Sequence, residues 1–106
     1  MTKIIRSLLV LAAVVSLAGA VNFAQSSGEA TYKAKCAMCH GPAGIPSAGM
    51  AKMMGVKPVS DPEIKKLTAD QMFAAVKGGK GKMQPFKDKL TDQQIREAIS
   101  FYRGLR

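Results

Sequence analysis

The stretch "CAMCH", at residues 36–40, contains both cysteines and the only histidine of the 106-residue chain. Three side chains that can bind a metal or form a covalent bond are therefore confined to five consecutive positions. Three kinds of chemistry use two cysteines separated by two residues: a structural zinc site, a dithiol–disulfide pair and the covalent attachment of haem.

These three explanations make different demands on the rest of the chain. A structural zinc site takes four ligands, but Cys36, Cys39 and His40 are the only Cys and His side chains present. A redox dithiol usually lies beside a strand–helix–strand pattern, which does not occur here. C-x-x-C-H is the signature of haem attachment, because both thiols lie along one turn and the next residue is directed at the iron. The motif therefore predicts one covalent haem c, with His40 as an iron ligand.

The composition is consistent with a bound group at the centre of a small domain. Leu, Ile, Val and Phe make up only about a sixth of the residues after Ala20, which is below the roughly one fifth expected of an ordinary folded chain. Small domains with so little apolar content often depend on a disulfide, a metal or a cofactor. The formal net charge is +9, so the chain is also strongly basic.

Residues 1–20 have the features of a secretory signal peptide: two basic residues, an uncharged apolar run and the small-residue sequence AGA at its end. We expect cleavage after Ala20, with Ala24 as a later alternative. An uncleaved membrane anchor is the other interpretation, but the run is shorter than the ~20 apolar residues that a spanning helix needs. The prediction is a single haem-binding domain over residues 21–106, exported to the periplasm.

Helical patterns dominate this domain, and three long segments carry them: residues 28–40, 68–79 and 91–105. In the second and third, a threonine is followed three residues later by a glutamine, which is the capping-box signature of a helix start. The third has an apolar stripe made of Ile95, Ala98, Ile99 and Tyr102. A shorter helix is expected over residues 48–54. No segment alternates with period two for long enough to form a sheet, so the predicted fold is all-α.

The second axial ligand of the iron has to be a methionine, a lysine or an open position, because there is no second histidine. Met38 lies inside the attachment motif, and Met72 shares a helix face with Val76, which favours core packing. The methionines within residues 50–54 are clustered, as is typical of flexible apolar lining. Met83 lies in a loop and is followed by the sequence "QPF", which can stiffen and anchor it. We predict Met83 as the sixth ligand, with the cluster at 50–54 as the alternative.

Three stretches, in this order, resemble the class I c-type cytochromes, the small soluble bacterial monohaem kind: "GEATYKAKCAMCHG", "LTADQMFAAVKGGKGKMQPF" and "LTDQQIREAISFYRGL". The resemblance covers essentially all of residues 21–106. It implies a cytochrome c fold wrapped around a haem attached to Cys36 and Cys39, with His40 and Met83 as axial ligands.

The resemblance also implies how the first and last helices meet. Gly28 and Tyr32 match positions where the family packs its first helix closely against its last, and Phe101 or Tyr102 would supply the aromatic partner. One departure is visible: the family often has a proline about a dozen residues after the histidine, and here Lys52 is near that place. We still expect a backbone carbonyl to accept the imidazole N–H, as is usual for metal-bound histidines.

A chain whose histidine and cysteines all hold haem has no residues left for catalysis. No Ser–His or Cys–His pair can form, so no catalytic residue is predicted and an enzyme is not expected. The prediction is a one-electron carrier in electron transport.

Five basic residues surround the predicted ligand loop: Lys77, Lys80, Lys82, Lys87 and Lys89. They favour redox partners with an acidic docking surface, or they simply keep the protein soluble.

Nucleic acid is not an expected partner of an exported haem protein. We expect a monomer that is not stably inserted in a membrane once the signal is cleaved. Two other functions remain open at this stage. The chain could be the cytochrome subunit of a periplasmic dehydrogenase or sulfur-oxidising complex, or a haem sensor or peroxidase with a labile sixth ligand.

Overall fold

The computed structural model describes residues 27–106. Residues 27–35 are helical, and five further helices follow: α2 (Ala37–His40), α3 (Ala48–Met54), α4 (Pro62–Lys65), α5 (Ala69–Gly78) and α6 (Asp92–Gly104). Within the described residues the only β pairing is an isolated bridge between Lys80 and Met83. The all-α prediction is therefore confirmed, as is the short helix expected over residues 48–54.

Both predicted capping boxes are present. The Thr68 hydroxyl accepts a hydrogen bond from the Gln71 N–H at 3.1 Å, and the Gln71 side chain accepts one from the Thr68 N–H at 2.9 Å. Thr91 and Gln94 repeat this arrangement at the start of α6 with the same two distances. Each box satisfies two backbone donors that a helix start leaves without partners. Helix α5 ends as expected at the glycine pair: Gly78 is its last residue, and Gly79, its C-cap, has a φ of 80°.

The first helix differs from the prediction, because it does not run unbroken from residue 28 to residue 40. It is interrupted at Cys36, where φ is −118° and ψ is −36°. The Cys36 N–H still donates to the Tyr32 carbonyl at 2.8 Å, while the Cys36 carbonyl accepts from both Cys39 and His40 at 3.2 and 2.9 Å. The chain thus turns at the first cysteine without losing its local hydrogen bonds, and α2 forms a separate turn.

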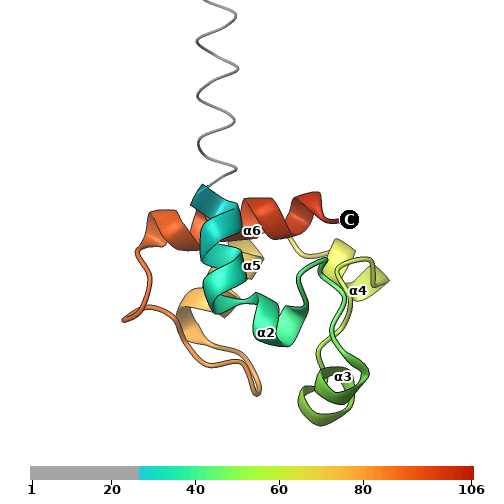
Figure 1. Ribbon diagram of the computed structural model, residues 1–106. Coiled ribbons are helices and arrows are strands. Elements are labelled where there is room, and N and C mark those ends of the chain that lie inside the picture. The colour runs from blue at the N-terminus through green and yellow to red at the C-terminus, as the bar shows by residue number, and fades with distance from the viewer. Residues whose placement is uncertain (1–26) are drawn as a thin grey trace, which may run out of the picture.

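Two packed regions hold the fold together. In Figure 1 the helix of residues 27–35 crosses α6, with α5 behind the crossing. The buried cluster lies largely between α5 and α6 and consists of Met72, Phe86, Ile95 and Ile99. The predicted apolar stripe of α6 is largely buried, since Ile95, Ala98 and Ile99 all face the interior. Helices α2, α3 and α4 bury no residue completely.

The crossing of the first helix with α6 depends on one glycine and one tyrosine. A Cβ atom placed on Gly28 would lie 2.3 Å from the Glu97 carbonyl oxygen, so the two backbones are in direct contact. One helical turn later, the Tyr32 ring lies 5.3 Å from the ring of Phe101 and 5.9 Å from that of Tyr102. Phe101 and Tyr102 are therefore both aromatic partners of Tyr32.

Candidate functional site

The attachment motif occupies one short helical turn. Cys36 precedes α2, and Cys39 and His40 are its last two residues. All three side chains are half-buried. The structure therefore brings the three predicted residues together at the edge of the packed interior, on a single turn that follows the first helix.

A tight turn follows His40. Gly41 and Gly44 have φ angles of 80° and 74°, in the left-handed region that glycine adopts without strain. A Cβ atom on Gly41 would lie 1.9 Å from the Ile45 carbonyl oxygen, and one on Gly44 would lie 2.8 Å from the Val59 side chain. Both glycines are therefore required by space as well as by backbone conformation, and together they fix the direction in which the chain leaves His40.

The imidazole of His40 is suited to bind a metal. Its ring meets the Tyr102 ring edge-on, with centroids 5.5 Å apart. Burial lowers the pKa of His40 below its usual value, which favours the neutral form that ligates metals. Nδ1 is buried and has no hydrogen-bond partner. The expected backbone acceptor for this nitrogen is therefore not found among residues 27–106.

The two cysteines do not have the character of a redox dithiol. Burial, followed by the proximity of Cys39, raises the pKa of Cys36 to about 11. Reactive dithiols have a nucleophilic cysteine whose pKa is lowered, so that it is ionised near neutral pH. Within residues 27–106, no group of three or more Cys, His, Asp or Glu side chains is arranged so that it could hold a metal ion by itself, which also argues against a structural zinc site.

Met83 lies in a tight loop whose backbone is paired. Lys80 and Met83 exchange two backbone hydrogen bonds of 3.1 and 3.0 Å. After the loop, the Phe86 N–H donates to the Val76 carbonyl at 3.0 Å, which ties this segment back to α5. Met83 is half-buried and packs against the core cluster, as Tyr102 does. Because Tyr102 also contacts His40, the two predicted axial ligands border the same packed region.

The other methionines have more ordinary positions. Met72 is buried in the core cluster, in line with the packing role expected for it. Met38 and Met53 are 84% and 64% exposed, and Met50 and Met54 are half-buried on α3. The burial of Met83 against the core thus separates it from the exposed members of this group.

The lysines around the ligand loop divide into two groups. Three make specific contacts: Lys77 pairs with Asp92 at 3.0 Å, Lys82 donates to the Met53 carbonyl at 2.7 Å, and Lys89 donates to Gln84 at 2.6 Å. Lys80 and Lys87 are exposed and make no side-chain hydrogen bond or ion pair with any residue from 27 to 106. The contact between Lys82 and α3 is not evident from the sequence, because 29 residues separate its two partners.

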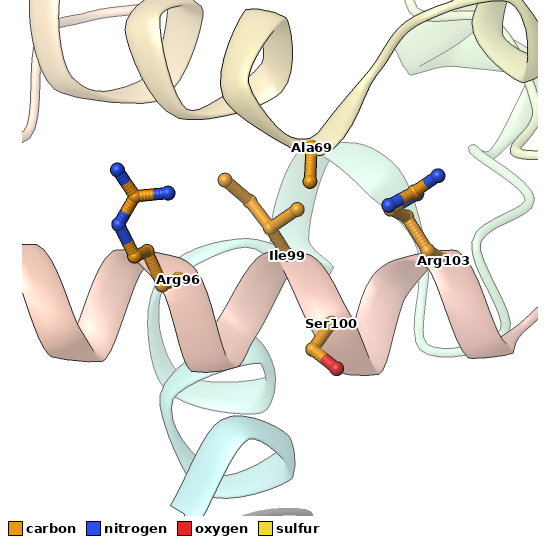
Figure 2. Close-up of a pocket in the computed structure, with 5 residues that line it drawn as sticks. All are labelled: Ala69, Arg96, Ile99, Ser100 and Arg103. Atoms are coloured by element: carbon orange, nitrogen blue, oxygen red, sulfur yellow. The ribbon is translucent and has the colours of Figure 1, made fainter.

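A small pocket of about 190 Å³ lies between α6 and the start of α5. Its lining residues are Ala69, Arg96, Ile99, Ser100 and Arg103. Figure 2 shows Arg96, Ile99 and Arg103 on the side of α6 that faces Ala69 and α5, with Ser100 on the other side. The Arg96 guanidinium already contacts Asp70 at 3.1 Å and lies over the Phe73 ring. None of the four predicted site residues lines this pocket, so it is separate from the haem site.

An all-helical fold built around a C-x-x-C-H turn defines the class of c-type cytochromes. Residues 23–101 match the family model described as "Cytochrome C oxidase, cbb3-type, subunit III". Cytochrome c-555 of Chlorobaculum tepidum is 32% identical over 98% of this chain and 97% of its own length. Cytochrome c-555 of Chlorobaculum thiosulfatiphilum is 37% identical over 74% of this chain and 93% of its own. No solved structure matches the chain.

The chain belongs to the class I monohaem c-type cytochromes, a family whose cofactor is haem c and whose work is haem-based electron transfer. The residues present fit that cofactor. Two thiols and an imidazole lie on one turn; burial lowers the pKa of His40, and its buried Nδ1 has no hydrogen-bond partner within residues 27–106. Within residues 27–106, no helix is both long enough and apolar enough to cross a bilayer.

Proposed function

We propose that this protein is a periplasmic electron carrier in which Cys36 and Cys39 hold the haem and His40 and Met83 bind the iron from opposite sides. When bound, haem c supplies a one-electron iron couple. The observation that carries the proposal is the packing of Met83 and the His40 partner Tyr102 against one core cluster. That arrangement connects the attachment turn and the ligand loop, which are 43 residues apart in the sequence.

The roles of the four residues follow from their chemistry. Cys36 and Cys39 provide covalent anchorage, so the cofactor is not lost during exchange of partners. His40 provides a neutral imidazole nitrogen, and Met83 provides a thioether. A thioether opposite imidazole favours the reduced iron and raises the reduction potential. Two protein ligands also leave no open position for a substrate, which suits a carrier and not an oxygenase or a peroxidase.

The replacement of Met83 by alanine tests the ligand assignment. We expect Met83→Ala to retain covalent haem but to lose the methionine–iron charge-transfer band of the oxidised protein and to bind carbon monoxide readily when reduced. Met53→Ala is the matched control, because it removes an exposed thioether from α3, and its spectra should equal those of the wild type. If Met83→Ala kept the charge-transfer band, another residue would be the ligand and the assignment would be wrong.

Export and the acidic partner belong to the same proposal. The basic and apolar start of the chain supports export, but it lies outside the described residues. Lys80 and Lys87 are exposed and unpaired within the described residues, so they can meet the acidic groups of a redox partner. Charges of this kind act mainly on the rate of encounter and on orientation.

A subunit role is the second candidate, because the matching family model is described as a subunit of a cytochrome c oxidase. The molecular size of the protein purified from its native source distinguishes a free carrier from a subunit of a larger enzyme. A monomer would support the free carrier, while stable copurification with an enzyme would support the subunit.

A further inference from the structure

The hydroxyl group of Tyr32 has a role that ring packing does not explain. The side chain is 1% exposed, and its hydroxyl donates a buried hydrogen bond of 2.6 Å to the carbonyl oxygen of Gly41, the residue directly after His40. A phenylalanine would fill the same space between the first helix and α6. The hydroxyl therefore stabilises the turn that follows His40, through a hydrogen bond between residues nine positions apart.

The Gly41 carbonyl is the centre of a small backbone network. It also accepts a hydrogen bond from the Gly44 N–H at 3.1 Å, and the Gly44 carbonyl accepts one from the Val59 N–H at 2.8 Å. Val59 is 2% exposed. The turn after His40 is thus tied at one end to the first helix through Tyr32 and at the other to buried Val59.

A second connection runs through the aromatic rings. The Tyr32 ring lies nearly parallel to the Tyr102 ring, with an angle of 24° between their planes. The Tyr102 ring in turn meets the His40 imidazole at 66°. Tyr32 is therefore connected to His40 in two ways. One is the hydrogen bond to the Gly41 backbone, which requires the Tyr32 hydroxyl, and the other is the ring contact through Tyr102, which does not.

We propose that Tyr32 is a positioning residue for His40. The Tyr32 hydroxyl holds the Gly41 carbonyl and so sets the orientation of the His40 imidazole plane. The inference rests on the proposed function, in which His40 is an axial ligand. A metal-bound imidazole is normally oriented by a hydrogen bond to its other nitrogen. Within residues 27–106 that nitrogen has no hydrogen-bond partner, so the restraint comes from the hydrogen bond between Tyr32 and the backbone beside the histidine.

The hydroxyl keeps its proton at ordinary pH. Burial, with smaller contributions from Tyr102 and Cys36, raises the pKa of Tyr32 to about 12. The hydroxyl is therefore protonated, and available as a donor, at neutral pH.

Tyr32→Phe in the full-length holoprotein tests the inference, with Tyr102→Phe as the matched control. Both variants lose one phenolic oxygen and keep the ring, but the Tyr102 hydroxyl makes no hydrogen bond with residues 27–106. The readout is the pattern of paramagnetically shifted haem methyl resonances in the oxidised protein, which depends on the orientation of the imidazole plane. We expect Tyr32→Phe to redistribute these shifts and Tyr102→Phe to change them much less. Exchange of the Gly44 amide hydrogen should become about tenfold faster in Tyr32→Phe only.

Two results would overturn the inference. In the first, Tyr32→Phe is less stable than the wild type but has the same methyl shifts, so the hydroxyl supports the fold alone. In the second, the reduced wild-type protein has no slowly exchanging Tyr32 hydroxyl proton. The second result needs no variant, so it decides the matter even if Tyr32→Phe does not fold. Failure of the proposed function would appear separately, as a His40→Ala protein that keeps the wild-type low-spin spectrum.

Discussion

At Gly28 the backbones of the first helix and α6 are in direct contact. The Glu97 carbonyl oxygen occupies the place where any side chain at position 28 would begin. A backbone atom cannot rotate away as a side chain can, so the two helices would have to separate to admit even a methyl group. Separation would also disturb the aromatic contacts of Tyr32, one turn further along.

We therefore expect Gly28→Ala to lower the free energy of unfolding of the holoprotein by about 2 kcal/mol, the usual range for an overpacked core. Denaturant unfolding followed by circular dichroism measures this loss. Gly49→Ala is the control, because a Cβ atom at this helical position meets nothing within 4 Å. It should leave stability unchanged or raise it by up to ~1 kcal/mol through helix propensity. Equal stabilities for Gly28→Ala and the wild type would contradict the close approach.

The residues of the attachment site were accessible to sequence reasoning because they are neighbours in the chain. Cys36, Cys39 and His40 lie within one turn in any helical arrangement. Met83 was predicted as the sixth ligand because its loop differs from the setting of the other methionines, and this assignment stays a prediction. The surroundings of His40 Nδ1 could not be predicted, since they depend on which distant backbone the fold brings near. The hydrogen bond from Tyr32 to Gly41 was missed for a related reason: in the sequence pattern Tyr32 has only the properties of a core residue.

At the scale of helices, local sequence signals predicted the long helices but not every short one. The capping boxes of α5 and α6 require only residues three apart, so the sequence contains both partners. Helix α4 has start signals of its own, since the Asp61 side chain accepts from the Glu63 N–H at 2.9 Å and Pro62 follows at the first position. Its four residues are too few for a periodic pattern, so it was not predicted. The break at Cys36 was not predicted either, because it preserves the local hydrogen bonds and leaves the apolar spacing of the sequence unchanged.

The ligand loop is joined to α3 by one side chain. The Lys82 ammonium group donates to the carbonyl of Met53, in the last turn of α3. Carbonyl groups at a helix end lack partners within the helix, and a cation is favoured there. Figure 1 shows the loop between α5 and α6 reaching toward α3 in the lower part of the molecule. Lys82 is therefore suited to restrain the loop that carries Met83.

We expect Lys82→Met to weaken this restraint and so to raise the affinity of the oxidised protein for added imidazole, which would compete with Met83 for the iron under the proposed ligation. A hydrogen bond from a charged donor contributes about 1.5 kcal/mol or more, which corresponds to about a tenfold change in affinity. Spectral titration with imidazole measures it. Lys80→Met removes an equal charge from the same loop without losing a hydrogen bond within residues 27–106, and its affinity should stay near the wild-type value. Equal effects of the two substitutions would show that charge alone matters.

Over the whole molecule, the positive charges of Lys80 and Lys87, which make no side-chain hydrogen bond or ion pair within residues 27–106, should act on encounter rates. The double variant Lys80→Glu/Lys87→Glu is expected to react more slowly with an anionic oxidant such as ferricyanide and faster with a cationic cobalt complex, most clearly at low ionic strength. Stopped-flow mixing gives both rates. Lys65→Glu/Lys66→Glu changes the net charge equally, at the end of α4. If both pairs had the same effect, net charge and not a local surface would govern the encounter.

The uneven core suggests that the fold depends on its cofactor. The buried cluster joins α5 and α6, whereas α2, α3 and α4 bury no residue completely. A chain this small and this poor in aliphatic residues has little free energy to offset the entropy of ordering.

We expect Cys36→Ser/Cys39→Ser, which cannot attach haem, to lose cooperative thermal unfolding and most amide dispersion in NMR spectra. Met38→Ser is the control, because it alters an exposed residue of the same turn and keeps all three haem-binding side chains. If the thiol-free chain unfolded cooperatively at the wild-type temperature, its side chains alone would be sufficient to specify the fold, and the attached group would serve only in electron transfer.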